Sequence, residues 1–139
     1  MKDTFEILGL RVEPGQSAKT VLELTLAGVA TKMPLFVFNG AYPGPTLVVT
    51  SGVHAAEYVA IHTTYRLARE LDAAQLYGQV VIAPIVSMTS FAKRAIYLAP
   101  PDDKNLNRQF PGDPNGSYAQ QLADWIFQNL IRRADAYID

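Results

Sequence analysis

Thr46-Leu47-Val48-Val49-Thr50 is followed directly by Ser51-Gly52-Val53-His54-Ala55-Ala56-Glu57. The first stretch is almost continuously apolar, which is typical of a strand buried on both faces. The spacing of apolar residues over 55–71 then predicts a helix, and residues 80–86 predict a second buried strand. Strand, helix and strand within about 40 residues indicate a βαβ unit with parallel strands. The predicted buried face of the helix contains Val59, Ala60, Thr63, Leu67 and Leu71.

The rest of the chain is predicted from turn and strand signals. Residues 1–19 indicate a lead-in loop with at most a short strand, and residues 42–45, Tyr-Pro-Gly-Pro, indicate a break. Strands are predicted at 21–26, at an edge or in a hairpin, and at 35–38. Residues 87–116 are predicted to be mostly irregular, with a helical turn at 90–94. A capping box at Ser117 and Gln120 predicts a helix with a buried face, and a third buried strand is predicted from residue 136. The residues of that face are Leu122, Ala123, Ile126, Leu130 and Ile131.

Composition excludes several classes of protein. Of the 139 residues, 49% are hydrophobic and 18% are charged, which predicts one soluble globular domain. The net charge of −1 gives no basic field for nucleic acid and no polybasic anchor for a membrane. The chain has no cysteine, which fits a reducing compartment, so we expect a cytoplasmic protein. The oligomeric state is left open.

His54 and Glu57 are the first candidate metal ligands. They lie three residues apart where a strand turns into a helix, so both side chains are expected on one face. An imidazole nitrogen and a carboxylate oxygen can each bind zinc, and ligands of open α/β sheets bind at the carboxyl ends of strands. The alternative is a turn histidine beside a first-turn acid that the helix dipole stabilises. His62 is predicted to point away, as a surface or half-buried helix residue.

A second candidate segment is Asn105-Leu106-Asn107-Arg108-Gln109-Phe110-Pro111-Gly112. It lies in the long connection after the second buried strand, and so belongs to the same edge of the sheet. Arg108 offers a rigid fork of donors for a carboxylate, and Asn107 adds a neutral hydrogen bond. The alternative is a surface arginine that caps a loop, with asparagine present for its turn preference.

These two motifs together resemble the succinylglutamate desuccinylase/aspartoacylase family, relatives of the zinc carboxypeptidases. The family pattern is G-x-H-G-x-E, then D/N-L-N-R-x-F-P-G, then a histidine just after a strand ending in I-D. The resemblance runs from about Thr46 to Asp139. It implies that His54 and Glu57 bind Zn²⁺, and that Asn107 and Arg108 bind the substrate's carboxylate or position its acyl group. Arg94 matches a further substrate-binding arginine by region only.

The resemblance implies an α/β fold with a mixed, largely parallel sheet and flanking helices, zinc-carboxypeptidase-like and truncated. Residues 1–139 are then the N-terminal part of one zinc-hydrolase catalytic domain, with lead-in strands at 1–45 and the βαβ core at 46–139. The third ligand histidine and the general-base glutamate are expected downstream, so we expect the chain alone to be inactive. The implied activity is hydrolysis of the amide bond of an N-acylated amino acid or similar small carboxylate. Two alternatives stay open: a metallocarboxypeptidase acting on peptides, and a non-catalytic α/β binding module with a degenerate metal site.

Overall fold

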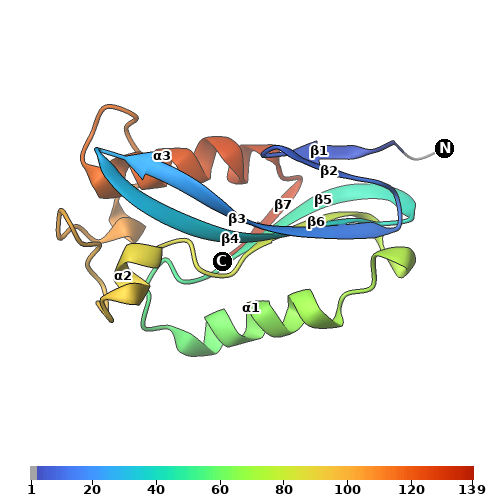
Figure 1. The fold of residues 1–139 in the computed structure, drawn as a ribbon, viewed down its shortest axis with the longest axis horizontal. Coiled ribbons are helices and arrows are strands. Elements are labelled where there is room, and N and C mark those ends of the chain that lie inside the picture. The colour runs from blue at the N-terminus through green and yellow to red at the C-terminus, as the bar shows by residue number, and fades with distance from the viewer. Residues whose placement is uncertain (1–2) are drawn as a thin grey trace.

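The structure of the protein, a computed structural model, describes residues 3–139 and is built around a mixed β-sheet (Figure 1). This main sheet has five strands in the order β3-β4-β6-β5-β7. β4 is antiparallel to both β3 and β6, whereas β5 is parallel to both β6 and β7. The predicted α/β class and mixed sheet are therefore confirmed. The strands are β3 (Gln16–Leu26), β4 (Val29–Asn39), β5 (Tyr42–Thr50), β6 (Tyr77–Ala83) and β7 (Ala136–Ile138).

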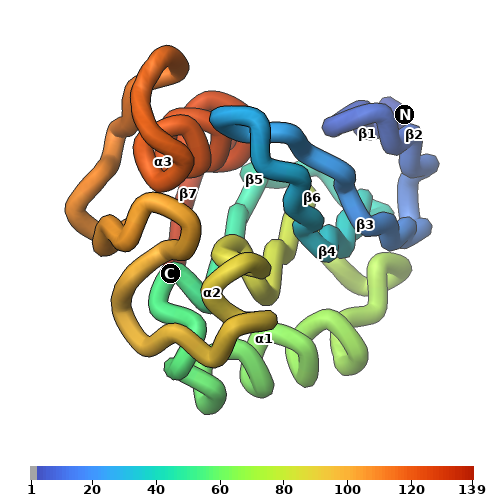
Figure 2. Tube along the Cα trace, turned by 60° about the vertical axis from the view of Figure 1, so that its left-hand side comes forward, coloured from blue at the N-terminus to red at the C-terminus, as the bar shows by residue number. Residues whose placement is uncertain are grey.

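Helices cover both faces of the sheet. α1 (Tyr58–Glu70) lies along one face and α3 (Tyr118–Asn129) along the other, with α2 (Met88–Ala92) near one end (Figures 1 and 2). β5, α1 and β6 form the predicted βαβ unit, because β5 and β6 pair in parallel. None of the helices within residues 3–139 is long and apolar enough to cross a membrane. Three 3₁₀ turns complete the helical segments: η1 (Ala73–Gln75), η2 (Leu106–Arg108) and η3 (Ile131–Arg133).

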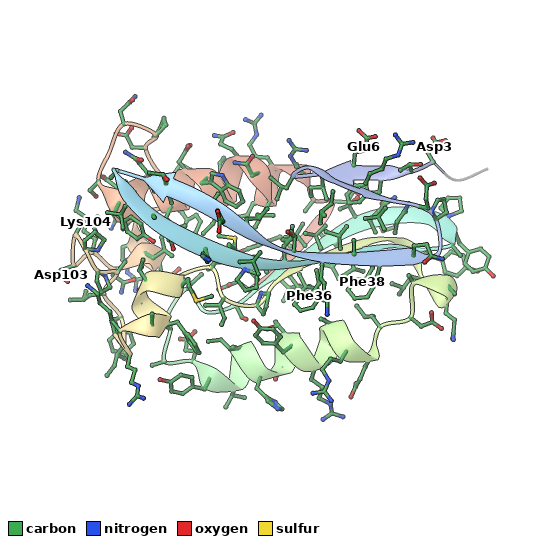
Figure 3. The ribbon with its side chains drawn as sticks, viewed as in Figure 1. Asp3, Glu6, Phe36, Phe38, Asp103 and Lys104 are labelled. Carbon is green, nitrogen blue, oxygen red and sulfur yellow. The ribbon has the colours of Figure 1, made fainter. Side chains whose placement is uncertain are left out.

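Each face of the sheet has its own core, because successive side chains of a strand point to opposite faces. On the α3 side, Leu35 and Val37 of β4 belong to a large cluster that includes Leu122 and Ile126 of α3. On the α1 side, Phe36 and Phe38 belong to a smaller cluster, and both point toward α1 in Figure 3. Of the predicted face of α3, Leu122, Ala123, Ile126 and Leu130 are buried and Ile131 is only partly buried. The helix also buries Tyr118 and Ala119 in its first turn, which were not predicted. The capping box of Ser117 and Gln120 is also confirmed.

The prediction of a lead-in loop over residues 1–19 is wrong. Within the described part, which begins at residue 3, the chain forms a hairpin of β1 (Phe5–Ile7) and β2 (Leu10–Val12), and β3 begins already at Gln16. The hairpin forms because Leu8 and Gly9 adopt positive φ angles of 50° and 80°, which suit a tight turn. Its last strand residues, Ile7 and Val12, are buried in the α3-side core.

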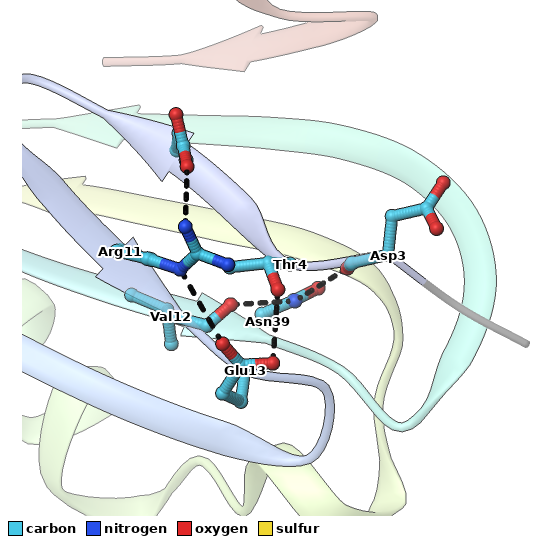
Figure 4. A network of polar contacts seen from close by, with 7 residues as sticks. Asp3, Thr4, Arg11, Val12, Glu13 and Asn39 are labelled. Carbon is cyan, nitrogen blue, oxygen red and sulfur yellow. Dashed lines mark hydrogen bonds and ion pairs between the residues drawn. The ribbon is translucent and has the colours of Figure 1, made fainter.

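Buried Asn39 holds this hairpin against β4. Its amide nitrogen donates to the backbone carbonyls of Asp3 and Val12, at 3.1 and 2.9 Å (Figure 4). Around it, Arg11 forms exposed ion pairs with Glu6 and Glu13. The hairpin thus depends on contacts with β4, 27 or more residues away, which local turn signals do not contain.

The predicted break at residues 42–45 is also wrong, since these residues begin β5. The prolines are accommodated because the pairing with β6 shifts between Tyr42 and Thr46, and prolines are tolerated at such irregularities. Pairing becomes regular from Thr46 onward, where the apolar run predicted a strand.

The predicted buried face of α1 is confirmed only in its second half, where Leu67 and Leu71 pack against the α1-side core. Val59 is 83% exposed, and Ala60 and Thr63 are exposed as well. The helix buries Ile61 and Thr64 instead, because the Thr64 hydroxyl meets the Ser51 hydroxyl at 2.7 Å below the end of β5. A buried polar contact therefore sets the rotation of α1, and apolar spacing alone did not reveal it.

The strand predicted from residue 136 is confirmed, but its burial is not. β7 pairs with β5 in parallel, as expected. Ile138 is nevertheless 56% exposed and Ala136 is exposed, because β7 is an edge strand within the described residues and packs on one side only.

Candidate active site

The connection from β5 to α1 is fixed by main-chain bonds before it reaches His54. The Ser51 amide donates to Ala83, and the Ser51 carbonyl accepts from Val86, so the chain stays bonded to the segment after β6. The Ser51 hydroxyl donates to the Pro84 carbonyl at 2.6 Å. Gly52 then turns the chain with a φ of 70°, a conformation that favours glycine. These bonds present His54 at the carboxyl end of a parallel strand.

His54 and Glu57 approach each other closely. Nδ1 of His54 lies 3.2 Å from Oε1 of Glu57. The imidazole is mostly buried, with 15% of its side chain exposed, whereas 56% of the Glu57 side chain is exposed. Glu57 occupies the N-cap position of α1, but its carboxylate makes no capping bond to the helix. The carboxylate is therefore directed at the imidazole instead of at the helix end.

Asn105 fixes the protonation of the imidazole. Its Oδ1 accepts the backbone N–H of Asn107 at 3.0 Å, which identifies this atom as the oxygen. The same oxygen lies 3.0 Å from Nε2 of His54, so Nε2 must carry a hydrogen and donate it. Nδ1 of a neutral imidazole then presents a lone pair to the Glu57 carboxylate. Two such acceptors attract each other only through a cation between them, either a proton or a metal ion.

The pair fits a zinc ion. Two ligand atoms that each lie about 2.0–2.2 Å from a tetrahedral zinc are roughly 3.3–3.6 Å apart, close to the 3.2 Å between Nδ1 and Oε1. The bond from Nε2 to Asn105 is the outer contact that zinc-bound histidines usually make. Within residues 3–139, no cluster of three or more His, Cys, Asp or Glu side chains is placed to share a metal.

Aromatic side chains flank the histidine. The Tyr97 ring meets the His54 ring edge to face, with centroids 5.3 Å apart and an interplanar angle of 88°. Tyr58 and Phe91 make a similar contact at 6.3 Å. Tyr97 comes from the long connection between α2 and α3, so this contact and that of Asn105 both bring the connection to His54.

Asn107 lies at the same edge of the sheet as His54. It is exposed and lines a largely apolar cavity of about 460 Å³. Arg108 follows in η2 and is exposed. Because Asn105 begins this turn and bonds to His54, the second motif lies next to the first, as predicted. The cavity is also lined by Val53, Phe110, Pro111, Phe127, Ile131, Tyr137 and Asp139.

Tyr137 and Asp139, which line this cavity, belong to a polar cluster with Thr50. Thr50, the last residue of β5, lies 2.7 Å from the Tyr137 hydroxyl and donates to Asp139 at 2.6 Å. The C-terminal residues accordingly lie beside the segment that leaves β5 (Figure 2). Burial raises the pKa of the Tyr137 phenol, the Thr50 hydrogen bond lowers it, and the charge of Asp139 raises it, with a net increase. Tyr137 thus stays a neutral hydrogen-bonding group.

Two other residues make no hydrogen bond or ion pair with His54 or Glu57 within residues 3–139. Arg94 follows α2 with a φ of 54°, is exposed, and makes no hydrogen bond or ion pair with His54, Glu57 or Asn107 among residues 3–139. His62 is exposed on α1 beside Arg66 and Arg69, away from His54 as predicted.

Sequence reasoning overlooked several residues around the pair. Asn105 was part of the second motif but was given no role, although an asparagine two residues before Asn107 is suited to accept the Asn107 amide. Tyr97 carried no sequence signal, since only the folded connection brings it to His54. The cluster around Thr50 depends on parallel pairing of β5 with β7, 87 residues apart at the Thr50–Tyr137 contact.

Comparison with known proteins identifies relatives over most of the chain. The model of the succinylglutamate desuccinylase/aspartoacylase catalytic domain matches residues 43–139. The chain is 36% identical over 96 residues to the N-alpha-acetyl-L-2,4-diaminobutyric acid deacetylase of Halomonas elongata, covering 69% of this chain and 28% of that protein.

Solved structures agree with this match. A succinylglutamate desuccinylase/aspartoacylase from Rhodobacter sphaeroides is 30% identical, with a TM-score of 0.80, over 88% of this chain and 39% of that one. The product-bound ectoine utilization protein EutE (DoeB) from Ruegeria pomeroyi is 29% identical, with a TM-score of 0.77, over 88% and 39%. The chain therefore spans well under half the length of these relatives.

Proposed function

Because the chain belongs to the succinylglutamate desuccinylase/aspartoacylase family, we propose that it forms part of a zinc-dependent hydrolase that removes the acyl group from an N-acylated amino acid or a similar small carboxylate. One observation carries this proposal. Nδ1 of His54 and Oε1 of Glu57 face each other at 3.2 Å, while Asn105 holds the hydrogen on Nε2. This arrangement leaves one imidazole nitrogen and one carboxylate oxygen placed to share a metal ion at the carboxyl end of β5.

His54 and Glu57 would hold zinc, which polarises a scissile carbonyl and lowers the pKa of bound water. Asn105 keeps the imidazole in the tautomer whose Nδ1 is available for a metal. Arg108 would bind a substrate carboxylate with its guanidinium fork, and Asn107 would add a neutral donor beside the cavity. We assign Arg94 a weaker substrate contact, because it lies in the same connection but away from the pair.

We propose that residues 1–139 form the N-terminal part of one catalytic domain, with lead-in strands at 1–45 and the motif-bearing core at 46–139. The third metal ligand and the general base would come from outside the described residues. Deacylation is favoured over peptide hydrolysis because the Halomonas relative is named for a small N-acetylated amino acid. An amino acid that is acylated on its α-amino nitrogen keeps a free carboxylate, which Arg108 is suited to bind.

Long-range ¹H–¹⁵N NMR of the imidazoles tests the metal site directly. The chain has only two histidines, so His62 is an internal control. We expect His54 as the Nε2–H tautomer, and we expect added Zn²⁺ to shift its Nδ1 signal while His62 stays unchanged. Equal shifts at both histidines, or an Nδ1–H tautomer at His54, would contradict the proposal.

An amine-release assay tests the activity. On a panel of N-acyl amino acids with saturating zinc, the chain alone is expected to show no measurable turnover, because loss of a general base alone removes about 10²–10⁴ in rate. Chelator-sensitive turnover that His54→Ala abolishes would show that the missing groups are recruited from this chain or from a second copy. His62, Asp102, Asp103 and Asp139 would then be the candidates.

A further inference from the structure

The outer edge of β3 is unpaired over the described residues. β3 is the first strand in the sheet order and pairs only with β4, over all 11 of its residues. The two-residue turn of Ala27 and Gly28 makes Leu26 and Val29 the closing pair of this hairpin. The even-numbered residues of β3 therefore direct their backbone N–H and C=O groups to β4. The odd-numbered residues between them direct their backbone groups outward. A long strand with such an edge is a template for another strand.

Side chains of opposite charge lie on either side of the middle of this edge. Val21 lies at the middle and is 55% exposed, while Lys19 and Glu23 lie two residues to either side and are exposed. An antiparallel copy of β3 centred on Val21 sets Val21 opposite its own copy. It also sets Lys19 opposite Glu23 of the copy, and Glu23 opposite Lys19 of the copy. The edge is therefore complementary in charge to itself, and Glu23 also forms an exposed ion pair with Lys32 of its own chain at 3.4 Å.

The pairing centred on Val21 satisfies two constraints, the direction of the backbone groups and the charges of the opposed side chains. Outward backbone groups belong to odd residues, so odd residues must face odd residues across a two-fold axis. Moving the copy to the next allowed position on one side puts Lys19 opposite Val21, and on the other side puts Glu23 opposite Val21. Only the pairing centred on Val21 sets opposite charges face to face, and such cross-strand pairs are stabilising.

An apolar groove adjoins the same edge. Val21 lines it together with Pro34 of β4, Tyr65 of α1, and Met88 and Ala92 of α2. A two-fold axis perpendicular to the sheet keeps this face on the same side in both copies. The two grooves then flank the paired Val21 side chains, and the copies share one continuous sheet.

We propose that β3 is a dimerisation edge, through which two copies of this chain pair antiparallel about Val21. This inference is independent of the proposed hydrolase function, because the edge lies on the opposite side of the sheet from β7 and from the Thr50 cluster.

Charge reversal tests the proposal in the full chain. Analytical ultracentrifugation is expected to show a concentration-dependent dimer, and Lys19→Glu or Glu23→Lys to weaken it about tenfold or more. An equimolar mixture of these two variants is expected to recover the dimer, because each Glu then faces a Lys. Glu70→Lys, an exposed change on α1, is the matched control and leaves the dimer unchanged. A monomeric wild type, or no recovery on mixing, overturns the proposal.

Cross-linking tests the register independently of affinity. The chain has no cysteine, so a single introduced thiol gives a clean signal. Opposed residues that exchange both backbone hydrogen bonds have Cα atoms about 5.5 Å apart, within the range that a disulfide spans. Val21→Cys is expected to give an oxidised dimer, whereas Ser17→Cys, which faces Thr25 of the copy, is not. Equal cross-linking at both positions, or none at position 21, contradicts the register.

Discussion

Two segments meet at the candidate site, and they are held in different ways. Residues 50–57 are fixed by main-chain hydrogen bonds to β6 and the residues that follow it, and by the buried hydroxyls of Ser51 and Thr64. Residues 94–112 bury Ala99 and Leu106 in the core and reach His54 through the side chains of Asn105 and Tyr97. The pair of His54 and Glu57 is therefore positioned by main-chain bonds of the sheet, whereas the long connection touches His54 through two side chains.

The largest expected effect comes from Gly52→Ala in the first segment. An added Cβ would combine a φ of 70° with approach to the Ile85 Cα at 3.3 Å. We expect a loss of about 2–3 kcal/mol in the free energy of unfolding, from left-handed strain of about 1–2 kcal/mol and the added contact. Gly9→Ala is the matched control, because its φ is 80° but nothing lies within 4 Å. Urea denaturation that gives equal losses for the two variants would show that packing at Gly52 is unimportant.

Asn105→Ala should break the link between the two segments. Removal of an outer partner of a metal-binding histidine typically lowers metal affinity about 10–100-fold, so we expect a loss of this size in zinc titrations. Asn105→Asp keeps an acceptor for both N–H groups and should retain most of the affinity. Asn115→Ala, an exposed loop change, serves as the control. Unchanged affinity in Asn105→Ala would remove Asn105 from the site.

Two adjacent threonines of α1, one buried against Ser51 and one exposed, allow the contribution of the buried contact to residues 50–57 to be measured. Thr64 and Thr63 each donate to the backbone carbonyl four residues earlier, but only Thr64 is buried against Ser51. Thr64→Val is expected to cost about 1–2 kcal/mol in unfolding free energy. Thr63→Val should stay within about 0.5 kcal/mol of the wild type. Thermal or urea unfolding measures both, and a larger loss at Thr63 would contradict the role given to Ser51.

The smallest effect concerns the start of the first segment, where Tyr137 contacts Thr50. The pKa of Tyr137 is raised in the folded protein, mainly by burial, so the folded state holds this proton more tightly than the unfolded state. The contribution of this proton to the free energy of unfolding is therefore fully present below pH 10.0, the ordinary pKa of tyrosine. It is lost as the pH rises through the higher pKa of Tyr137 in the folded protein. Tyr137→Phe should flatten this loss when unfolding is measured on both sides of pH 10. If the free energy of unfolding of the wild type rose with pH in this range, the pKa of Tyr137 would not be raised in the folded protein.

The same contrast separates what the sequence could predict from what it could not. The apolar run at 46–50 and the capping box at Ser117 carry their structural signal locally, so the second half of β5 and the start of α3 were predicted correctly. The rotation of α1 depends on Thr64 meeting Ser51, and the hairpin at the N-terminus depends on Asn39, a partner distant in sequence. For the candidate site, spacing brought His54 and Glu57 together, but the contact with Asn105 forms only when the long connection folds back.

If His54 holds zinc and the segment of Asn107 binds the substrate, as proposed, the shared oxygen of Asn105 couples the two sites thermodynamically. One atom accepts both the imidazole N–H of His54 and the backbone N–H of Asn107. A ligand that orders the loop therefore also orders the imidazole, and a metal on the imidazole orders the loop. Because coupling between two sites is reciprocal, the factor by which zinc tightens carboxylate binding equals the factor by which a carboxylate tightens zinc binding.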